Sequence, residues 1–194
     1  MRIQPVALLS LLLFASACSA PTVRAQRVAG TPGASDAKRA AQALAAEVEG
    51  PPRTVSELPL SRFPDGTTMH LSEARGSVVL LDVWATWCGP CVEALPAYDA
   101  LAKRYAGQGL VVYALSLDED PRQVARFVAD TGIRLPILLD DQDHAVSRAL
   151  KVRGVPTTYL IDREGTIRSI HDGYEPENLP ALVAQIEQLL AERP

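Results

Sequence analysis

Two cysteines in the middle of the chain have a spacing that suits redox chemistry. Cys88 and Cys91 form a C-x-x-C motif where a nearly continuous apolar run gives way to a segment of helical periodicity. A thiol at a helix N-terminus meets free backbone N–H groups and the positive end of the helix dipole, which stabilise a thiolate. We therefore expect the pKa of Cys88 to lie below the value of about 8.5 for a free cysteine.

The spacing gives the two thiols different expected roles. Cys91 lies one helical turn further on, close enough to Cys88 for a disulfide but deeper in the fold. We expect Cys88 to attack a substrate disulfide and Cys91 to resolve the mixed disulfide that results. Gly89 permits close approach of a substrate chain, and Pro90, which lacks an N–H, is tolerated in the first turn.

Three other interpretations of the cysteine pair have weaker support. A structural zinc site needs about four ligands, and the histidines that could complete it, His70, His144 and His171, lack ligand spacing. Haem attachment requires a histidine where Val92 stands. A structural disulfide across three positions closes too short a loop to add much stability. The acidic run 140–143 also lacks the glycine and glutamate of a calcium-binding loop, so we expect no metal and no cofactor.

Alternating strands and helices must position these thiols. Apolar runs without polar alternation predict buried strands, and apolar residues at helical spacing predict amphipathic helices. The pattern favours an α/β fold with a sheet of mixed direction. The expected elements are a hairpin over 63–71 turning at Asp65-Gly66, strands 77–84, 110–117 and 135–139, helices 90–105, 121–130 and 143–150, a hairpin of strands 157–161 and 166–171, and a closing helix 177–192.

Two sequence motifs carry a family resemblance. Residues 81–91 read LDVWATWCGPC, Pro96 follows, and residues 154–162 read GVPTTYLID. From about Leu58 onward, this pattern resembles the thioredoxin superfamily, in particular its exported TlpA/ResA-type thiol-disulfide oxidoreductases. The resemblance implies a thioredoxin-like fold, in which helices flank a mixed central sheet, with an N-terminal β-hairpin and a strand-helix insertion around 118–150.

The same resemblance implies the residues that bind substrate. Val155-Pro156 is expected to be a cis peptide bond beside the disulfide, with the backbone of Val155 pairing with an extended substrate segment. Gly89 and Pro90 belong to the same surface. Trp87 is expected to shield the disulfide. Trp84 is expected to pack beside it, and core packing is an equally good explanation of that residue.

Asp82 is the other residue with expected chemistry. It lies in an otherwise apolar strand six positions before Cys88, where a carboxylate is costly unless it is paired or functional. The resemblance to cytosolic-type thioredoxins implies that Asp82 accepts the proton of Cys91, with a pKa raised by burial. A structural carboxylate bonded to a neighbouring strand is the alternative. TlpA-type proteins commonly have an uncharged residue there and a Glu where this chain has Ala94. We expect Glu93 to be solvated.

The N-terminus is typical of an export signal. Arg2 is a short positive region, residues 6–14 are apolar, and residues 15–17 form a small-residue cleavage site. A transmembrane helix needs about 20 apolar residues, and this apolar stretch is shorter. The residues around Cys18 resemble the lipobox of bacterial lipoproteins, which implies lipidation of Cys18. Cleavage without lipidation, after residue 17 or after Ala20, is the alternative.

The rest of the N-terminal region and the composition indicate the domain organisation and the class of partner. Residues 1–17 are the expected export signal, 18–55 an Ala-, Pro- and Gly-rich linker, and 56–194 the thioredoxin-like domain. A net charge of −4 without a Lys/Arg block argues against nucleic-acid binding. We expect the protein to reside in the bacterial periplasm, anchored to the membrane by a lipid at Cys18. A soluble periplasmic or secreted protein is the alternative.

The leading hypothesis is an exported reductase of protein disulfides. The resemblance implies electrons from a membrane thiol donor of the DsbD or CcdA type and clients such as apocytochrome c. A disulfide-donating oxidant and a thiol peroxidase are alternatives, although the peroxidase pattern P-x-x-x-T-x-x-C would need Pro at Leu81 and Thr at Ala85. A redox-sensing or chaperone-like binding module is the non-enzymatic alternative.

Overall fold

The computed structural model of the chain describes residues 54, 57, 59–140 and 142–192. The predicted export signal 1–17, the lipidation site Cys18 and all of the linker 18–55 except Thr54 lie outside the described residues. Thr54 itself forms an isolated antiparallel bridge with Thr166. Within the described part of the chain, no helix is both long and apolar enough to cross a membrane.

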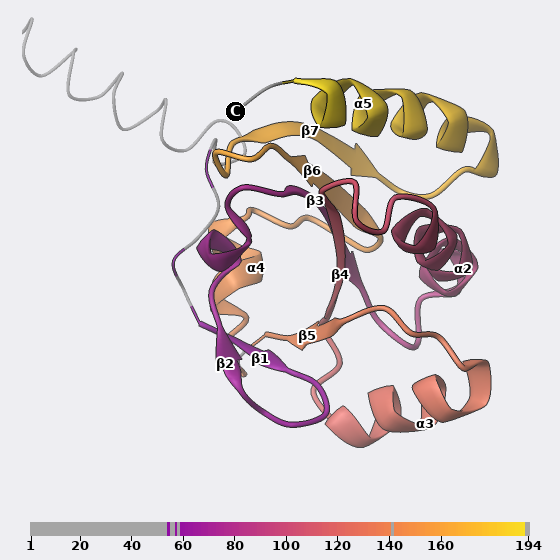
Figure 1. Cartoon of the computed structure of the whole chain (residues 1–194). Helices are drawn as coiled ribbons and strands as arrows, with labels where there is room; N and C mark the ends of the chain where they lie inside the picture. Colours follow the sequence, from indigo (N-terminus) through magenta and orange to yellow (C-terminus); the bar gives the residue numbers. More distant parts are fainter. Residues whose placement is uncertain (1–53, 55–56, 58, 141, 193–194) are drawn as a thin grey trace, which may run out of the picture. The chain divides into compact units, whose positions relative to one another are not determined.

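The described residues form a mixed sheet with the strand order β2-β1-β5-β4-β3-β6-β7 (Figure 1). β3 pairs in parallel with β4 and antiparallel with β6, so it has a neighbour on each side. This is a thioredoxin-like fold, as the sequence predicted. The strands are β1 Leu60–Arg62, β2 Thr68–Met69, β3 Val78–Trp84, β4 Leu110–Ser116, β5 Ile137–Leu139, β6 Thr157–Ile161 and β7 Ile167–Asp172.

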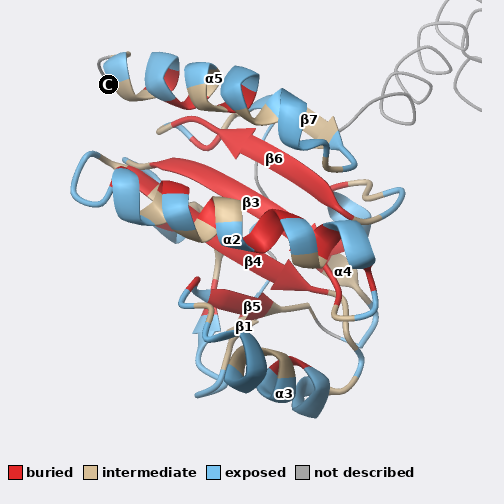
Figure 2. Ribbon diagram, turned by 90° about the vertical axis from the view of Figure 1, so that its right-hand side faces the viewer, coloured by how far each residue is buried: buried red, intermediate tan, exposed pale blue. Residues whose placement is uncertain are grey.

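Helices cover both faces of the sheet, and Figure 1 shows α4 on one side and α2 and α3 on the other. The central strands are buried along their length (Figure 2). Because side chains alternate along a strand, β3 contributes to both layers. The helical elements are η1 Leu71–Ala74, α2 Gly89–Arg104, α3 Pro121–Thr131, α4 Ala145–Ala149, η2 Pro176–Asn178 and α5 Leu179–Ala191. Val78, Leu80 and Trp84 pack in the layer of α2 and α5, and Val79, Leu81 and Val83 in that of η1 and α4.

The N-terminal hairpin differs from its predicted position. Its first strand is Leu60–Arg62, so Phe63, which was expected to lie in a strand, begins the turn. The turn is longer than the Asp65-Gly66 dipeptide suggested, because Arg62 accepts from the N–H of Gly66 and donates to the carbonyl of Thr67. Gly66 adopts a φ of 70°, which favours glycine.

Three other elements begin later than predicted, two of them for a local reason. The strand expected over 135–139 starts at Ile137, after Pro136, and Pro has no N–H to donate to a ladder. The short helix starts at Ala145. The closing helix starts at Leu179, because residues 176–178 form a separate 3₁₀ turn. The other predicted strands and helices agree with the structure to within about two residues, the usual uncertainty at element ends.

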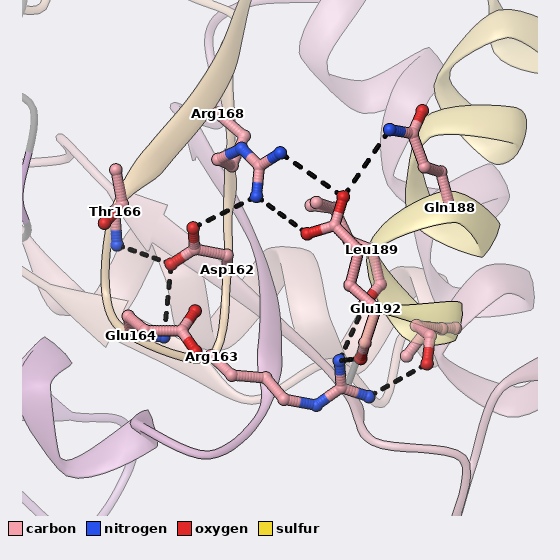
Figure 3. Close-up of polar contacts among 9 residues, drawn as sticks. Asp162, Arg163, Glu164, Thr166, Arg168, Gln188, Leu189 and Glu192 are labelled. Carbon is pink, nitrogen blue, oxygen red and sulfur yellow. Dashed lines mark hydrogen bonds and ion pairs between the residues drawn. The ribbon is translucent and has the colours of Figure 1, made fainter. Parts of the chain in front are cut away.

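The C-terminal end of α5 is fastened to the turn between β6 and β7 (Figure 3). The guanidinium of Arg163 donates to the carbonyl oxygens of Leu189 and Glu192, each at 2.7 Å. Arg168 forms ion pairs with Asp162 at 3.3 Å and with Glu192 at 2.8 Å. These contacts hold α5 over the face of the sheet on which α2 also packs.

Candidate active site

A disulfide between Cys88 and Cys91 lies at the N-terminus of α2. Cys88 is the N-cap residue of the helix, and Pro90 occupies the first turn, where its missing N–H is not needed. The backbone N–H of Cys91 donates to Sγ of Cys88 at 3.3 Å. In the reduced chain, this donor and the helix dipole would stabilise a thiolate on Cys88.

The two cysteines differ in their access to solvent. Cys88 is 7% exposed and Cys91 is 0% exposed. Gly89 and Pro90, which lie between them, are both exposed. An incoming sulfur can therefore reach Cys88 from the surface, whereas Cys91 is accessible only from inside the site. This asymmetry fits the predicted division into an attacking and a resolving thiol.

Asp118 holds the loop that leads from β3 into the cysteine motif. Its carboxylate accepts from the backbone N–H of Thr86 at 3.0 Å, from the Thr86 hydroxyl at 2.6 Å and from the Ser116 hydroxyl at 2.8 Å. The sequence analysis gave Asp118 no role. No local sequence pattern marks it, because Asp118 and Thr86 come together only once strands 78–84 and 110–116 pair in parallel and end at the same edge of the sheet.

Asp82 is fully buried in β3, between the two strands that flank it. Its Oδ1 accepts a hydrogen bond from Oγ1 of Thr158 at 2.9 Å, and the Tyr98 hydroxyl lies 3.0 Å from the same Thr158 oxygen. Because the single hydroxyl proton of Thr158 is donated to Asp82, Tyr98 donates to Thr158. Oδ2 of Asp82 has no hydrogen-bond partner among the described residues.

This environment shifts the protonation of Asp82. Burial raises the pKa of Asp82 from 3.8 to about 7, and the hydrogen bond from Thr158 opposes part of that rise. Burial and the charge of Asp82 raise the pKa of Tyr98 as well, so Tyr98 stays a hydrogen-bond donor. The Thr158 contact is what a structural carboxylate requires, whereas a pKa of about 7 with an unpaired oxygen suits a group that exchanges protons.

Asp82 and Cys91 belong to the same layer of the fold. Alternation along β3 places Asp82 on the face that carries Leu80 and Trp84, and these two residues share a buried cluster with Cys88 and Cys91. Tyr98, three residues after Leu95 on α2, reaches the same face through Thr158. The buried acid and the buried thiol thus lie between α2 and the sheet, which protects both from bulk water.

The two tryptophans have opposite environments. Trp84 is fully buried, and its ring centroid lies 4.9 Å from that of Phe127. It is part of the core and belongs to the same buried cluster as Cys88, and its packing directly beside the disulfide stays a prediction. Trp87 is 69% exposed, and most of its ring faces solvent. Glu93 is exposed, as expected.

The second predicted motif lies against the first. The Val155-Pro156 peptide bond is cis, as expected, with Pro156 buried and Val155 half-buried. A surface groove of about 460 Å³ has both Trp87 and Val155 in its lining. The structure therefore brings together two residues, 68 positions apart, that the sequence assigned to substrate binding.

Among the described residues, no group of three or more His, Cys, Asp or Glu side chains is placed to hold a metal ion. The acidic run after β5 instead supplies Asp140, which accepts from the backbone N–H groups of Val146 at 3.1 Å and Ser147 at 2.8 Å. These N–H groups belong to the first turn of α4, so Asp140 caps that helix.

Comparison with known proteins gives consistent findings. Residues 55–170 match the AhpC/TSA family. The chain is 37% identical over 110 residues to the thioredoxin-like protein YneN of Bacillus subtilis, covering 56% of this chain and 64% of that protein. It is 36% identical over 108 residues to the thiol-disulfide oxidoreductase ResA of Geobacillus kaustophilus, covering 56% of this chain and 62% of that protein. The matched region thus spans somewhat less than two thirds of these relatives.

Among solved structures, the chain resembles a DsbE-type thiol:disulfide interchange protein from Chlorobium tepidum. The TM-score is 0.68 and the sequence identity 31%. The match covers 73% of this chain and 99% of the other. The likeness therefore extends over the whole thioredoxin-like fold of that protein.

Proposed function

Because the chain belongs to the AhpC/TSA family, we propose that it acts as a thiol-disulfide oxidoreductase and that it reduces disulfides in client proteins. The observation that carries this proposal is the Cys88–Cys91 disulfide at the N-terminus of α2, in which Cys88 is 7% exposed and Cys91 is 0% exposed. The names of the relatives YneN and ResA support the same class of activity.

The reaction moves two electrons from the chain to the client. The Cys88 thiolate attacks one sulfur of a client disulfide, whose other sulfur leaves as a thiolate and takes up a proton. Cys91 then loses its proton and attacks the sulfur of Cys88, which releases the first client sulfur as a thiol. The client disulfide is reduced, and the Cys88–Cys91 disulfide of the structure is formed.

Asp82 is the proposed proton acceptor for Cys91. A carboxyl with a pKa of about 7 is partly ionised at neutral pH, so it can accept a proton and return it. Thr158 and Tyr98 orient it by the chain of hydrogen bonds that ends on Oδ1, and Oδ2, which has no hydrogen-bond partner among the described residues, is the oxygen proposed to accept the proton. Asp118 acts as a positioning residue, because it fixes the loop before Cys88.

The client is held by the exposed surface around Cys88. Trp87, Gly89 and Pro90 are exposed parts of that surface, and Val155, which lines the same groove as Trp87, is half-buried and is followed by the buried Pro156. The backbone of Val155 is proposed to pair with an extended client segment. This arrangement lays the client disulfide across Cys88, the cysteine that the solvent reaches.

The cellular setting is a further part of the proposal. Residues 1–17 direct export, Cys18 carries a lipid, 18–55 form a linker, and residues from 56 onward act in the periplasm. Each turnover leaves the chain oxidised, so a dithiol must reduce it again. A membrane thiol donor of the DsbD or CcdA type is proposed for that role and apocytochrome c as a client, both as the resemblance of the sequence motifs implies. The relatives support the thiol-disulfide exchange on which this setting depends.

Catalytic turnover separates this proposal from a redox-sensing or chaperone-like module. With dithiothreitol in excess, we expect the full-length chain to reduce many equivalents of a protein disulfide such as that of insulin. The readout is the precipitation of the insulin chain that reduction releases. The same chain should consume no more hydroperoxide than the dithiothreitol blank. Reduction that stops at one equivalent per chain would contradict the proposal, and rapid hydroperoxide turnover would favour the thiol peroxidase.

A further inference from the structure

The groove beside Cys88 has a chemical character of its own. It is formed by the loop before Cys88, by α4, and by the segment that leads to the cis Val155-Pro156 bond. Its volume is about 460 Å³. The residues of its lining that matter for binding are Trp87, Leu117, Arg148, Val152, Arg153 and Val155.

Part of the groove lining is apolar. Leu117, Val152 and Val155 are half-buried and pack against the buried core clusters. Trp87, which also lines the groove, is 69% exposed, and it is the large hydrophobic side chain that stands exposed among the described residues. Exposed aromatic side chains next to an apolar hollow are typical of protein-binding sites.

The groove also carries unbalanced positive charge. Arg148 on α4 and Arg153 before the cis peptide bond are both exposed, and no Asp or Glu lines the groove. Among the residues that the structure describes, neither guanidinium has an ion-pair partner, unlike Arg122, which pairs with Asp120 at 2.9 Å. A chain of net charge −4 thus presents two unpaired cations beside its reactive cysteine.

We propose that this groove binds an extended client segment that has apolar side chains near its cysteine and acidic side chains beyond them. The apolar side chains contact Trp87 and Val155, and the carboxylates pair with Arg148 and Arg153, whose forked guanidinium suits a carboxylate. This inference rests on the proposed reduction of client disulfides and adds a preference among clients.

The geometry of an extended segment determines the design of the test peptide. Side chains two positions apart face the same way in a strand. A peptide Glu-Ser-Leu-Ser-Cys-Ser-Leu-Ser-Glu therefore turns its cysteine, both leucines and both glutamates toward the groove, whichever way it runs. The matched peptide has lysine in place of both glutamates. In each, the cysteine is joined by a disulfide to 2-thiopyridine, a neutral leaving group that absorbs light once released.

The experiment measures how fast the reduced full-length chain attacks each peptide. The Cys88 thiolate takes the peptide sulfur and releases thiopyridone, and Cys91 then frees the peptide thiol. At low salt, we expect the glutamate peptide to react roughly tenfold faster than the lysine peptide, with the ratio approaching one at high salt. The double variant Arg148→Glu/Arg153→Glu should reverse the order. Arg126→Glu/Arg134→Glu, an equal charge change at exposed positions outside the groove, should preserve it.

The outcomes separate this inference from the function on which it rests. Equal rates for the two peptides, or an order that Arg148→Glu/Arg153→Glu leaves unchanged, would overturn the acidic-client preference while leaving disulfide reduction intact. Failure of the reduced chain to release thiopyridone from either peptide would overturn the proposed function, and the preference would fall with it.

Discussion

Replacing Cys91 with serine is expected to turn the chain into a trap that keeps its client in a mixed disulfide. Cys88 can still attack, because it is the more exposed of the two cysteines, but a serine hydroxyl cannot displace the client from the Cys88 sulfur. We expect turnover to fall by roughly a thousandfold or more. Intact mass spectrometry without reductant should show an adduct of one chain and one client.

The matched control replaces Cys88 instead. Cys91 is 0% exposed, so the Cys88→Ser variant should neither turn over nor capture a client. Both variants are best made with Cys18→Ser as well, since a chain produced without lipidation has a free Cys18 thiol that would form mixed disulfides of its own. Capture by Cys88→Ser together with no capture by Cys91→Ser would mean that the roles of the two cysteines are reversed.

Asp82→Asn is expected to make the oxidised chain more stable at high pH. The pKa of Asp82 is about 7 in the folded chain and 3.8 in the unfolded chain, so between these values only the folded chain keeps the proton. The contribution of Asp82 to the free energy of unfolding is therefore fully present below pH 4, and it is lost as the pH rises through 7. The loss corresponds to roughly 4 kcal/mol, and the neutral amide of the variant does not incur it.

Urea unfolding of the oxidised protein at two pH values measures this effect. We expect parent and Asp82→Asn to be nearly equal at pH 4 and to differ by roughly 4 kcal/mol at pH 9, with the variant the more stable. A difference that does not change between the two pH values would show that Asp82 does not titrate with a raised pKa.

The same substitution should slow catalysis while it stabilises the fold. Without an acceptor for its proton, the resolving attack of Cys91 should slow by about 10²- to 10⁴-fold at neutral pH. Thr158→Val is the matched control. It removes the hydrogen bond that lowers the pKa of Asp82 but keeps the acid, so the pH profile of the resolving step should move upward. If Asp82 were only structural, neither variant would change the rate or pH profile of this step.

The predictable parts of the fold and site are those encoded locally. The run 78–84 has seven buried residues and no polar alternation, so its central place in the sheet could be predicted. The C-x-x-C pair indicated its own disulfide and the start of a helix. Asp82 drew attention because it interrupts an apolar strand. In each case the signal lies within about ten residues of the feature.

The remaining parts depend on contacts between distant positions. Asp118 acts on Thr86, 32 positions earlier, and Thr158 binds Asp82 across 76 positions. Their types alone do not distinguish them from other Asp and Thr residues of the chain. Arg148 and Arg153 likewise resemble any surface arginines until the fold places them beside Trp87. Such roles follow only from the strand order, which periodicity does not determine.

The equilibrium reduction potential of the Cys88/Cys91 pair tests the central claim most directly. The full-length chain would be equilibrated with ratios of reduced and oxidised dithiothreitol, and the fraction of disulfide measured after acid quenching. A reductase fed by a membrane dithiol should give a value of about −270 mV, as in thioredoxin. A value of about −120 mV, as in DsbA, would contradict the account and make the chain a donor of disulfides.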